Sequence, residues 1–244
     1  NAFPDDRVLK AAESGELATA KGRKRVVEMM LASPRLEEGM RAFFDDMLAC
    51  VAEQFAVDKE CVSTMGVSAG ALFSSMLASR HGDNLSSFIS LSGGTGGGLI
   101  QDWIPNQNHM PALVLWGGPQ DICLSIEFDL NSMTMEAALA ADNHFMVECI
   151  HNCNHSTPPF EVPDDMTAFA PLWDFMFAHP YWLEPGQSPY NSEGLPPSMP
   201  TWCAIGVGNA VPPLYARKLA LAIEDYFRSE EHTSELQSLR HISY

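Results

Sequence analysis

The chain has 244 residues, 46% of them hydrophobic, so its length predicts one or two domains with a sizeable core. Its formal net charge of −17 argues against nucleic acid or an anionic membrane surface as a partner. No apolar run approaches the roughly 20 residues of a membrane-spanning helix, so no membrane span is predicted.

The two ends of the chain differ in composition from its middle. Residues 1–34 hold six of the fourteen Lys and Arg, whereas residues 35–227 hold six against twenty-three Asp and Glu. We therefore expect a helical appendage at 1–34, with short amphipathic helices at 5–14 and 22–32, and a core at 35–228. Residues 229–238 resemble translated adapter sequence, so 229–244 are expected to be a disordered, non-native tail.

The middle of the chain alternates between two kinds of apolar pattern. Apolar residues recur with helical spacing at 36–55, and helices are also predicted at 71–80, 125–141, 165–178 and 214–227. Short runs rich in β-branched and aromatic residues predict strands at 61–65, 86–91, 112–117 and 144–150. This alternation predicts an α/β fold with a mostly parallel sheet. The proline-rich segment 179–213 is expected to be an irregular surface excursion.

The most informative motif is the G-x-S-x-G sequence at residues 66–70, which lies between the predicted strand 61–65 and the helix that follows it. A nucleophile on so abrupt a strand-to-helix turn needs glycines two residues before and after it, because side chains there would collide. Ser68 is therefore a candidate nucleophile. The alternative interpretation is a plain turn without chemistry.

A serine nucleophile needs a base, and the base needs an acid to fix its tautomer. In an α/β-hydrolase the order along the chain is Ser, acid, His, with each residue in a loop after a strand. Asp121 follows the predicted strand 112–117 and is the preferred acid; Asp102 and Asp129 are its competitors.

Two histidines follow the predicted strand 144–150. His155 is the preferred base, because it lies in the turn region beyond the strand, whereas His151 lies at the strand end and has packing as its simpler role. Cys149, His151, Cys153 and His155 also alternate with period two and are all zinc-ligand types. Along a straight strand they extend about 20 Å, too far to close a tetrahedron without a sharp bend. Neither a metal nor another cofactor is therefore predicted.

Four motifs resemble the polyhydroxybutyrate-depolymerase and feruloyl-esterase-like branch of the α/β-hydrolases over about residues 41–182. They are Val57-Asp58, the elbow at 66–70, Trp116 to Asp121, and His151 to His155. The resemblance implies hydrolysis of a small-molecule or polymeric ester: Ser68 attacks, His155 acts as general base and then acid, Asp121 orients it, and the Ala69 amide is an oxyanion donor. The alternative is a non-catalytic binding or scaffold module of the same fold, or an inactive fragment.

The resemblance fails at the front of the chain. No strand pattern precedes Cys61, and no HGGG-type sequence supplies a second oxyanion donor. We therefore expect an N-terminally incomplete fold with an unpaired sheet edge and low turnover of even activated esters. The glycine-rich stretch 93–98 is expected to form a flexible turn beside the site, although one of its amides is an alternative donor.

Residues 1–48 instead resemble a helical segment of bacterial cytochrome-associated domains of unknown function. The two resemblances overlap at residues 43–48. That overlap leaves two interpretations, a joined reading frame and a native pair of amphipathic helices.

Two further expectations concern the substrate pocket and the cysteines. Phe73, Trp103 and Trp116 are candidates for an aromatic-accepting pocket, with core packing as the alternative. Six cysteines permit up to three disulfides, and Cys50 and Cys61 are close enough in sequence to pair. A disulfide would favour a secreted or periplasmic protein over a cytoplasmic one.

Overall fold

The computed structural model describes most of the chain. The described residues are Lys10, 14–15, Thr19, 21–22, 34–96, 100–124, 126–180, 183–184 and 186–206. The helices predicted at 5–14, 22–32 and 214–227, and the tail at 229–244, lie outside them apart from a few isolated positions. None of the helices described is long and apolar enough to cross a membrane.

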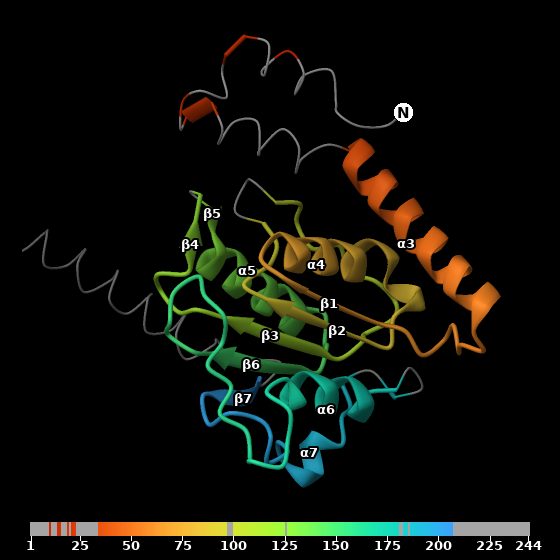
Figure 1. Ribbon diagram of the computed structural model, residues 1–244, viewed down its shortest axis with the longest axis vertical. Coiled ribbons are helices and arrows are strands. Elements are labelled where there is room, and N and C mark those ends of the chain that lie inside the picture. The colour runs from red at the N-terminus through yellow and green to blue at the C-terminus, as the bar shows by residue number, and fades with distance from the viewer. Residues whose placement is uncertain are drawn as a thin grey trace, which may run out of the picture. The chain divides into compact units, whose positions relative to one another are not determined.

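A five-stranded sheet organises the described residues, with the order β1-β2-β3-β6-β7 (Figure 1). Its strands are β1 (Ser63–Val67), β2 (Ser87–Leu91), β3 (Ala112–Trp116), β6 (Met146–Ile150) and β7 (Cys203–Gly206). The first four run parallel, and only β7 is antiparallel to its neighbour β6. The prediction of a mostly parallel sheet is confirmed, and each of the four predicted strands lies within two residues of its expected place.

Helices cover both faces of this sheet. Figure 1 shows α4 (Ala69–His81) and α5 (Phe128–Ala141) on one face, and α6 (Ala170–Ala178) on the other. On the α6 face, alternate residues of β2, β3 and β6 pack against Leu172 and Phe175 and form a core cluster. Strands β2 and β3 are buried at every position, which requires cover on both faces of the sheet, so the protein belongs to the α/β class.

Helix α3 and several smaller elements complete the description. They are α3 (Pro34–Gln54), the 3₁₀ turn η2 (Gly82–Asn84), α7 (Tyr190–Glu193), and the two-stranded pair β4 (Ile122–Cys123) and β5 (Ile126–Glu127). The segment expected to be irregular, 179–213, therefore contributes a helical turn and the strand β7. Helix α6 also begins five residues later than predicted, because the chain from Pro163 to Phe169 forms turns.

Strand β1 lies at the edge of the sheet, and no strand among the described residues pairs with its outer side. Met65 and Val67 on this strand are 44% and 58% exposed, which is unusual in a parallel sheet. Helix α3 does not pair with this edge. It lies against α4, where Phe44 packs edge-on to the ring of His81, whose Nε2 is 2.8 Å from Asp45 Oδ1.

The disulfide in this structure joins Cys149 on β6 to Cys203 on β7. The two residues are direct partners in the antiparallel register, with their Cα atoms 4.1 Å apart. The predicted pairing of Cys50 with Cys61 is wrong, since both are exposed free thiols. Sequence distance suggested the wrong pair because the β6–β7 register brings together cysteines 54 residues apart.

Loss of this disulfide is expected to destabilise the protein. Closing a loop of 54 residues removes unfolded-state entropy worth about 4 kcal/mol in the chain-entropy treatment. Urea unfolding of Cys203→Ser should show a lower midpoint than the parent chain and no further change with dithiothreitol. The control is Cys153→Ser, which removes an exposed free thiol. A Cys203→Ser midpoint equal to that of the control would contradict the prediction.

Acid should destabilise the fold through His179, which is fully buried after α6. Its Nδ1–H donates to the Phe175 carbonyl at 2.6 Å, and Nε2 accepts from the Ser188 hydroxyl at 2.7 Å. Burial lowers the pKa of this imidazole from 6.5 to about 4. Since the unfolded chain takes up the proton first, about 3 kcal/mol of stability is present above pH 6.5 and lost between 6.5 and 4.

The measurement is the urea unfolding free energy of the parent chain and of His179→Gln at pH 7 and pH 4.5. The glutamine variant should be less stable at pH 7, because ring packing is lost, yet show a smaller drop on acidification. His81→Gln, at the partly exposed end of α4, serves as control. Equal drops for the parent and His179→Gln would rule His179 out as the source.

Candidate active site

Ser68 lies on a sharp turn between β1 and α4. Its backbone has φ 55° and ψ −119°, a region that residues with a side chain rarely occupy. A Cβ on Gly66 would lie 2.1 Å from the backbone of Gly70, so only glycine allows this close approach. The Ser68 amide donates to the Leu91 carbonyl at 2.9 Å, which ties the turn to β2. The G-x-S-x-G spacing therefore corresponds to a strained strand-to-helix elbow.

A chain of hydrogen bonds runs from Ser68 to Asp121 through His155. The Ser68 Oγ is 2.9 Å from His155 Nε2, and His155 Nδ1 is 2.6 Å from Asp121 Oδ1. Asp121 is fully buried, whereas His155 is half-buried and its ring stacks on Phe128 with centroids 4.4 Å apart. This geometry can pass a proton from the hydroxyl to the imidazole while the carboxylate holds the ring.

The loops that carry Asp121 and His155 are locked to each other. Gly117 N–H donates to Asp121 Oδ2 at 2.8 Å, and Asn154 N–H donates to the Gly117 carbonyl at 2.9 Å. A Cβ on Gly117 would lie 1.7 Å from the Asn154 carbonyl oxygen, so the approach requires glycine. At Gly118 the backbone has φ +83°, which again favours glycine. These contacts preorganise the acid and the histidine.

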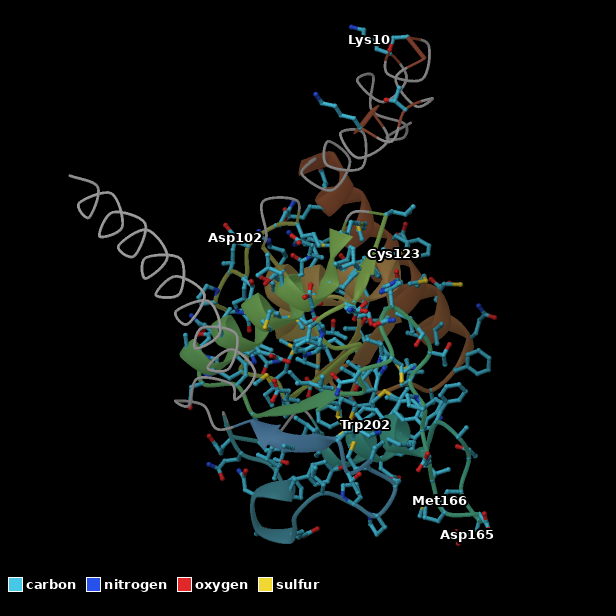
Figure 2. The ribbon with its side chains drawn as sticks, turned by 90° about the vertical axis from the view of Figure 1, so that its left-hand side faces the viewer. Lys10, Asp102, Cys123, Asp165, Met166 and Trp202 are labelled. Atoms are coloured by element: carbon cyan, nitrogen blue, oxygen red, sulfur yellow. A yellow bond between two sulfur atoms is a disulfide. The ribbon has the colours of Figure 1, made fainter. Side chains whose placement is uncertain are left out.

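The competing residues have other positions in the fold, and Asp129 is next to Asp121. His151 accepts a hydrogen bond from the Cys153 amide at Nδ1 and packs edge-on against Trp202; burial lowers its pKa. Asp129 lies in the first turn of α5, and its amide donates to the Asp121 carbonyl. Asp102 is exposed beside Arg80, and Figure 2 shows it far from Cys123, which is two residues past Asp121. The structure thus brings together the three preferred residues.

The four alternating cysteines and histidines do not gather around a common point. The chain does bend after β6, since Asn152 and Asn154 have φ values of 54° and 60°. The sulfur of Cys149, however, is bonded to Cys203. Within the described residues, no three His, Cys, Asp or Glu side chains are placed to hold a metal ion.

The aromatic residues expected around the substrate lie in three different places. Trp116 is completely buried under α5 and donates its indole N–H to Glu136 Oε1 at 2.8 Å, so it belongs to the core. Trp103 stacks on Phe88 at the amino ends of the strands, the opposite edge of the sheet from Ser68. Phe73 alone is near the elbow, where it lines a cavity of about 60 Å³ with Ala69.

The prediction that Trp116 lines the substrate pocket is wrong, because its partner in the core is a buried acid on a helix that is distant in sequence. Glu136 of α5 faces Glu148 of β6, and burial together with the nearby carboxylate raises the pKa of Glu136 well above its usual value. This shift favours the neutral form of Glu136, which avoids two buried charges in contact. The pair supports the end of β3 from which the Gly117 turn starts.

The amide of Ala69 is the first of α4 and has no intrahelical acceptor, which is the usual position of an oxyanion donor. The glycine-rich stretch was expected to be a flexible turn, but its described part, 93–96, is buried. There the Thr95 amide donates to the Asn131 carbonyl. Gly94 has φ +107° and lies against the backbone of Asn131 in α5.

Two features of the site were not predicted. Phe128 stacks on His155, although nothing in its spacing from Asp121 indicated the contact. A groove of about 320 Å³ lies along β1 next to Ser68. Alternating apolar residues on an edge strand are the signal that could have indicated it.

Comparison with known proteins gives limited matches. Residues 1–81 match a family described as PSD4, a protein of unknown function (DUF1592). This match covers 81 of 244 residues and extends past the boundary expected near Pro34 to include the elbow. No curated protein matches the sequence.

Two solved structures match this chain. A variant of pOPH in complex with DMSO has a TM-score of 0.53 at 16% identity, over 72% of this chain and 63% of that chain. Native pOPH has a TM-score of 0.49 at 18% identity with the same coverage. The chain thus spans 63% of the length of the pOPH chain, and the first likeness supports the α/β fold.

Proposed function

We propose that this chain is a serine-dependent carboxylic ester hydrolase that works through an acyl-enzyme. The observation that carries the proposal is the hydrogen-bonded series Ser68–His155–Asp121, with its serine on a strained elbow. Strain at a non-glycine residue persists where the surroundings impose it, and it is concentrated at functional sites. The resemblance of the motifs to the polyhydroxybutyrate-depolymerase and feruloyl-esterase-like branch agrees with this chemistry.

The proposed reaction has two half-reactions. Ser68 Oγ attacks the ester carbonyl carbon as His155 Nε2 takes the hydroxyl proton; the carbonyl π bond opens and the oxygen becomes negative. The carbonyl re-forms as the alcohol leaves with the proton from His155. Water then attacks the acyl-serine, gives a proton to His155, and releases the acid; Ser68 recovers the proton. Asp121 stays ionised and stabilises the imidazolium.

The Ala69 amide is proposed as one oxyanion donor, and no second donor is assigned. Loss of one donor typically costs 10² to 10³ in turnover, about 2.7–4 kcal/mol. We therefore expect p-nitrophenyl acetate turnover by this chain to be slow, but Ser68-dependent. A kcat in the median range of enzymes, about 10 s⁻¹, would show that another group completes the oxyanion hole.

The test of the proposal is labelling with a fluorophosphonate probe, which reacts with an activated serine. The parent chain should be labelled with one probe per molecule, and Ser68→Ala should not be labelled. The matched control is Ser192→Ala, which removes an exposed hydroxyl on α7. Labelling of Ser68→Ala, or no labelling of the parent, would refute an activated Ser68.

The second candidate is a non-catalytic binding or scaffold module, or an inactive fragment. It is favoured by the open edge of β1 and by the 63% coverage of the pOPH chain. A folded chain that is neither labelled nor active on p-nitrophenyl acetate would support it over the hydrolase.

We also propose an oxidising compartment, the periplasm or the exterior of the cell, because Cys149 and Cys203 are paired. A small-molecule or polymeric ester is the proposed substrate, and the residue chemistry proposed for the site requires no cofactor.

A further inference from the structure

An apolar groove lies directly beside the Ser68–His155 pair and has no part in the proton transfers proposed above. It has a volume of about 320 Å³. Its walls come from the outer face of β1, from the chain after His155, and from α6. The side chains that define it are Met65, Val67, Pro158, Phe160, Phe169 and Trp173.

Three lining residues place the groove close to the reacting hydroxyl. Val67 is the residue before Ser68, and Thr157, also in the lining, is two residues past His155. Leu91 forms part of the floor, and its carbonyl accepts the Ser68 amide. A molecule whose ester carbon lies at Ser68 therefore has the groove within reach.

The lining determines which chemical groups the groove can accept. It contains no charged side chain, and the only polar lining residue is Thr157. Phe169 and Trp173 are 53% and 50% exposed, so an apolar ligand would remove substantial apolar area from water. The net charge of −17 disfavours anions. A cavity of about 150 Å³ accepts benzene in another protein, so 320 Å³ has room for a larger group.

We propose that this groove binds an uncharged apolar group of the ester substrate, the size of a single or fused aromatic ring. The inference rests on the proposed ester hydrolysis at Ser68 and specifies its substrate class. The aromatic side of the site is then formed by Phe160, Phe169 and Trp173, not by the residues around Trp103 and Trp116. The apolar group can belong to the acid part or to the alcohol part of the ester. The two series of esters described in the next paragraph distinguish these cases.

The kinetic test compares Trp173→Ala and Phe169→Ala with the parent chain. One series keeps the acetyl group and changes the alcohol from ethyl to 2-naphthyl; the other keeps 4-nitrophenol and changes the acid from acetyl to 2-naphthoyl. We expect kcat/KM for the naphthyl ester of one series to fall about tenfold, with the small esters changing less than twofold. Ile104→Ala, an exposed apolar residue at the opposite edge of the sheet, is the control.

A binding test separates this inference from the proposed function. Calorimetric titration of Ser68→Ala with 2-naphthol needs no turnover. Binding that is lost in Ser68→Ala/Trp173→Ala but kept in Ser68→Ala/Ile104→Ala supports the groove, whatever the hydrolysis assays give. Ser68-dependent hydrolysis with no selective effect of Trp173→Ala and no naphthol binding overturns the groove and leaves the esterase. If sedimentation shows that Trp173→Ala only converts a dimer to a monomer, a second copy occupies the groove and the inference is wrong.

Discussion

Replacing Ser68 or His155 with alanine is expected to lower kcat for p-nitrophenyl acetate at least about 10⁴-fold, with little change in KM. The two side chains are 2.9 Å apart and would act as one unit, because the hydroxyl is a poor nucleophile without a base. The double variant should therefore lose no more activity than either single variant. Steady-state kinetics of the three variants measure this non-additivity.

The control for this experiment is His151→Gln, which changes the other histidine of the loop. Because His151 packs against Trp202 and does not contact Ser68, its variant should keep activity within a few-fold of the parent. Unfolding midpoints of all variants should be compared, so that loss of fold is not counted as loss of chemistry. Independent, multiplying losses in Ser68→Ala and His155→Ala would contradict a shared proton-transfer step.

Asp121→Asn is expected to lower kcat about 10⁴-fold while leaving the fold intact. Gly117 N–H donates to Asp121 Oδ2 at 2.8 Å, so the asparagine should place its carbonyl oxygen there. Its NH₂ would then face His155 Nδ1, which must become the acceptor. The ring proton moves to Nε2, between the imidazole and Ser68, and the base is lost.

The matched control is Asp102→Asn, which removes an exposed carboxylate next to Gly96 and should leave kcat unchanged. Nitrogen-15 NMR of histidine-labelled protein reports the tautomer of His155 directly. Activity within tenfold of the parent for Asp121→Asn would show that the carboxylate serves only to hold the loops together.

The parts of the site that could be predicted depend on short-range rules. The strain at Ser68 is produced by five consecutive residues, so the spacing of the glycines indicates it. Asp121 and His155 follow neighbouring parallel strands, whose carboxyl ends meet at the same edge of a sheet. That rule predicts that Asp121 and His155 lie close together, and it requires no knowledge of side-chain contacts.

The features that were missed depend on distant partners. Strand β7 exists because it pairs with β6 across 54 residues, and its four residues have no pattern of their own. The environment of Trp116 depends on which face of β3 is covered by α5, where Glu136 accepts its indole N–H. The division of the chain at Pro34 remains a prediction.

The Cys149–Cys203 bond also makes one stretch of backbone a covalent ring, and His155, the groove residues Phe160 and Trp173, and all of α6 lie on it. A protease that cuts once between residues 161 and 167, where the chain is mostly exposed, would open this ring without releasing either piece. The nicked protein would run as a single species on a gel without reductant and as two fragments with it. A chain cut there would thus keep Trp173 and α6 attached to the fragment that carries Ser68 and His155.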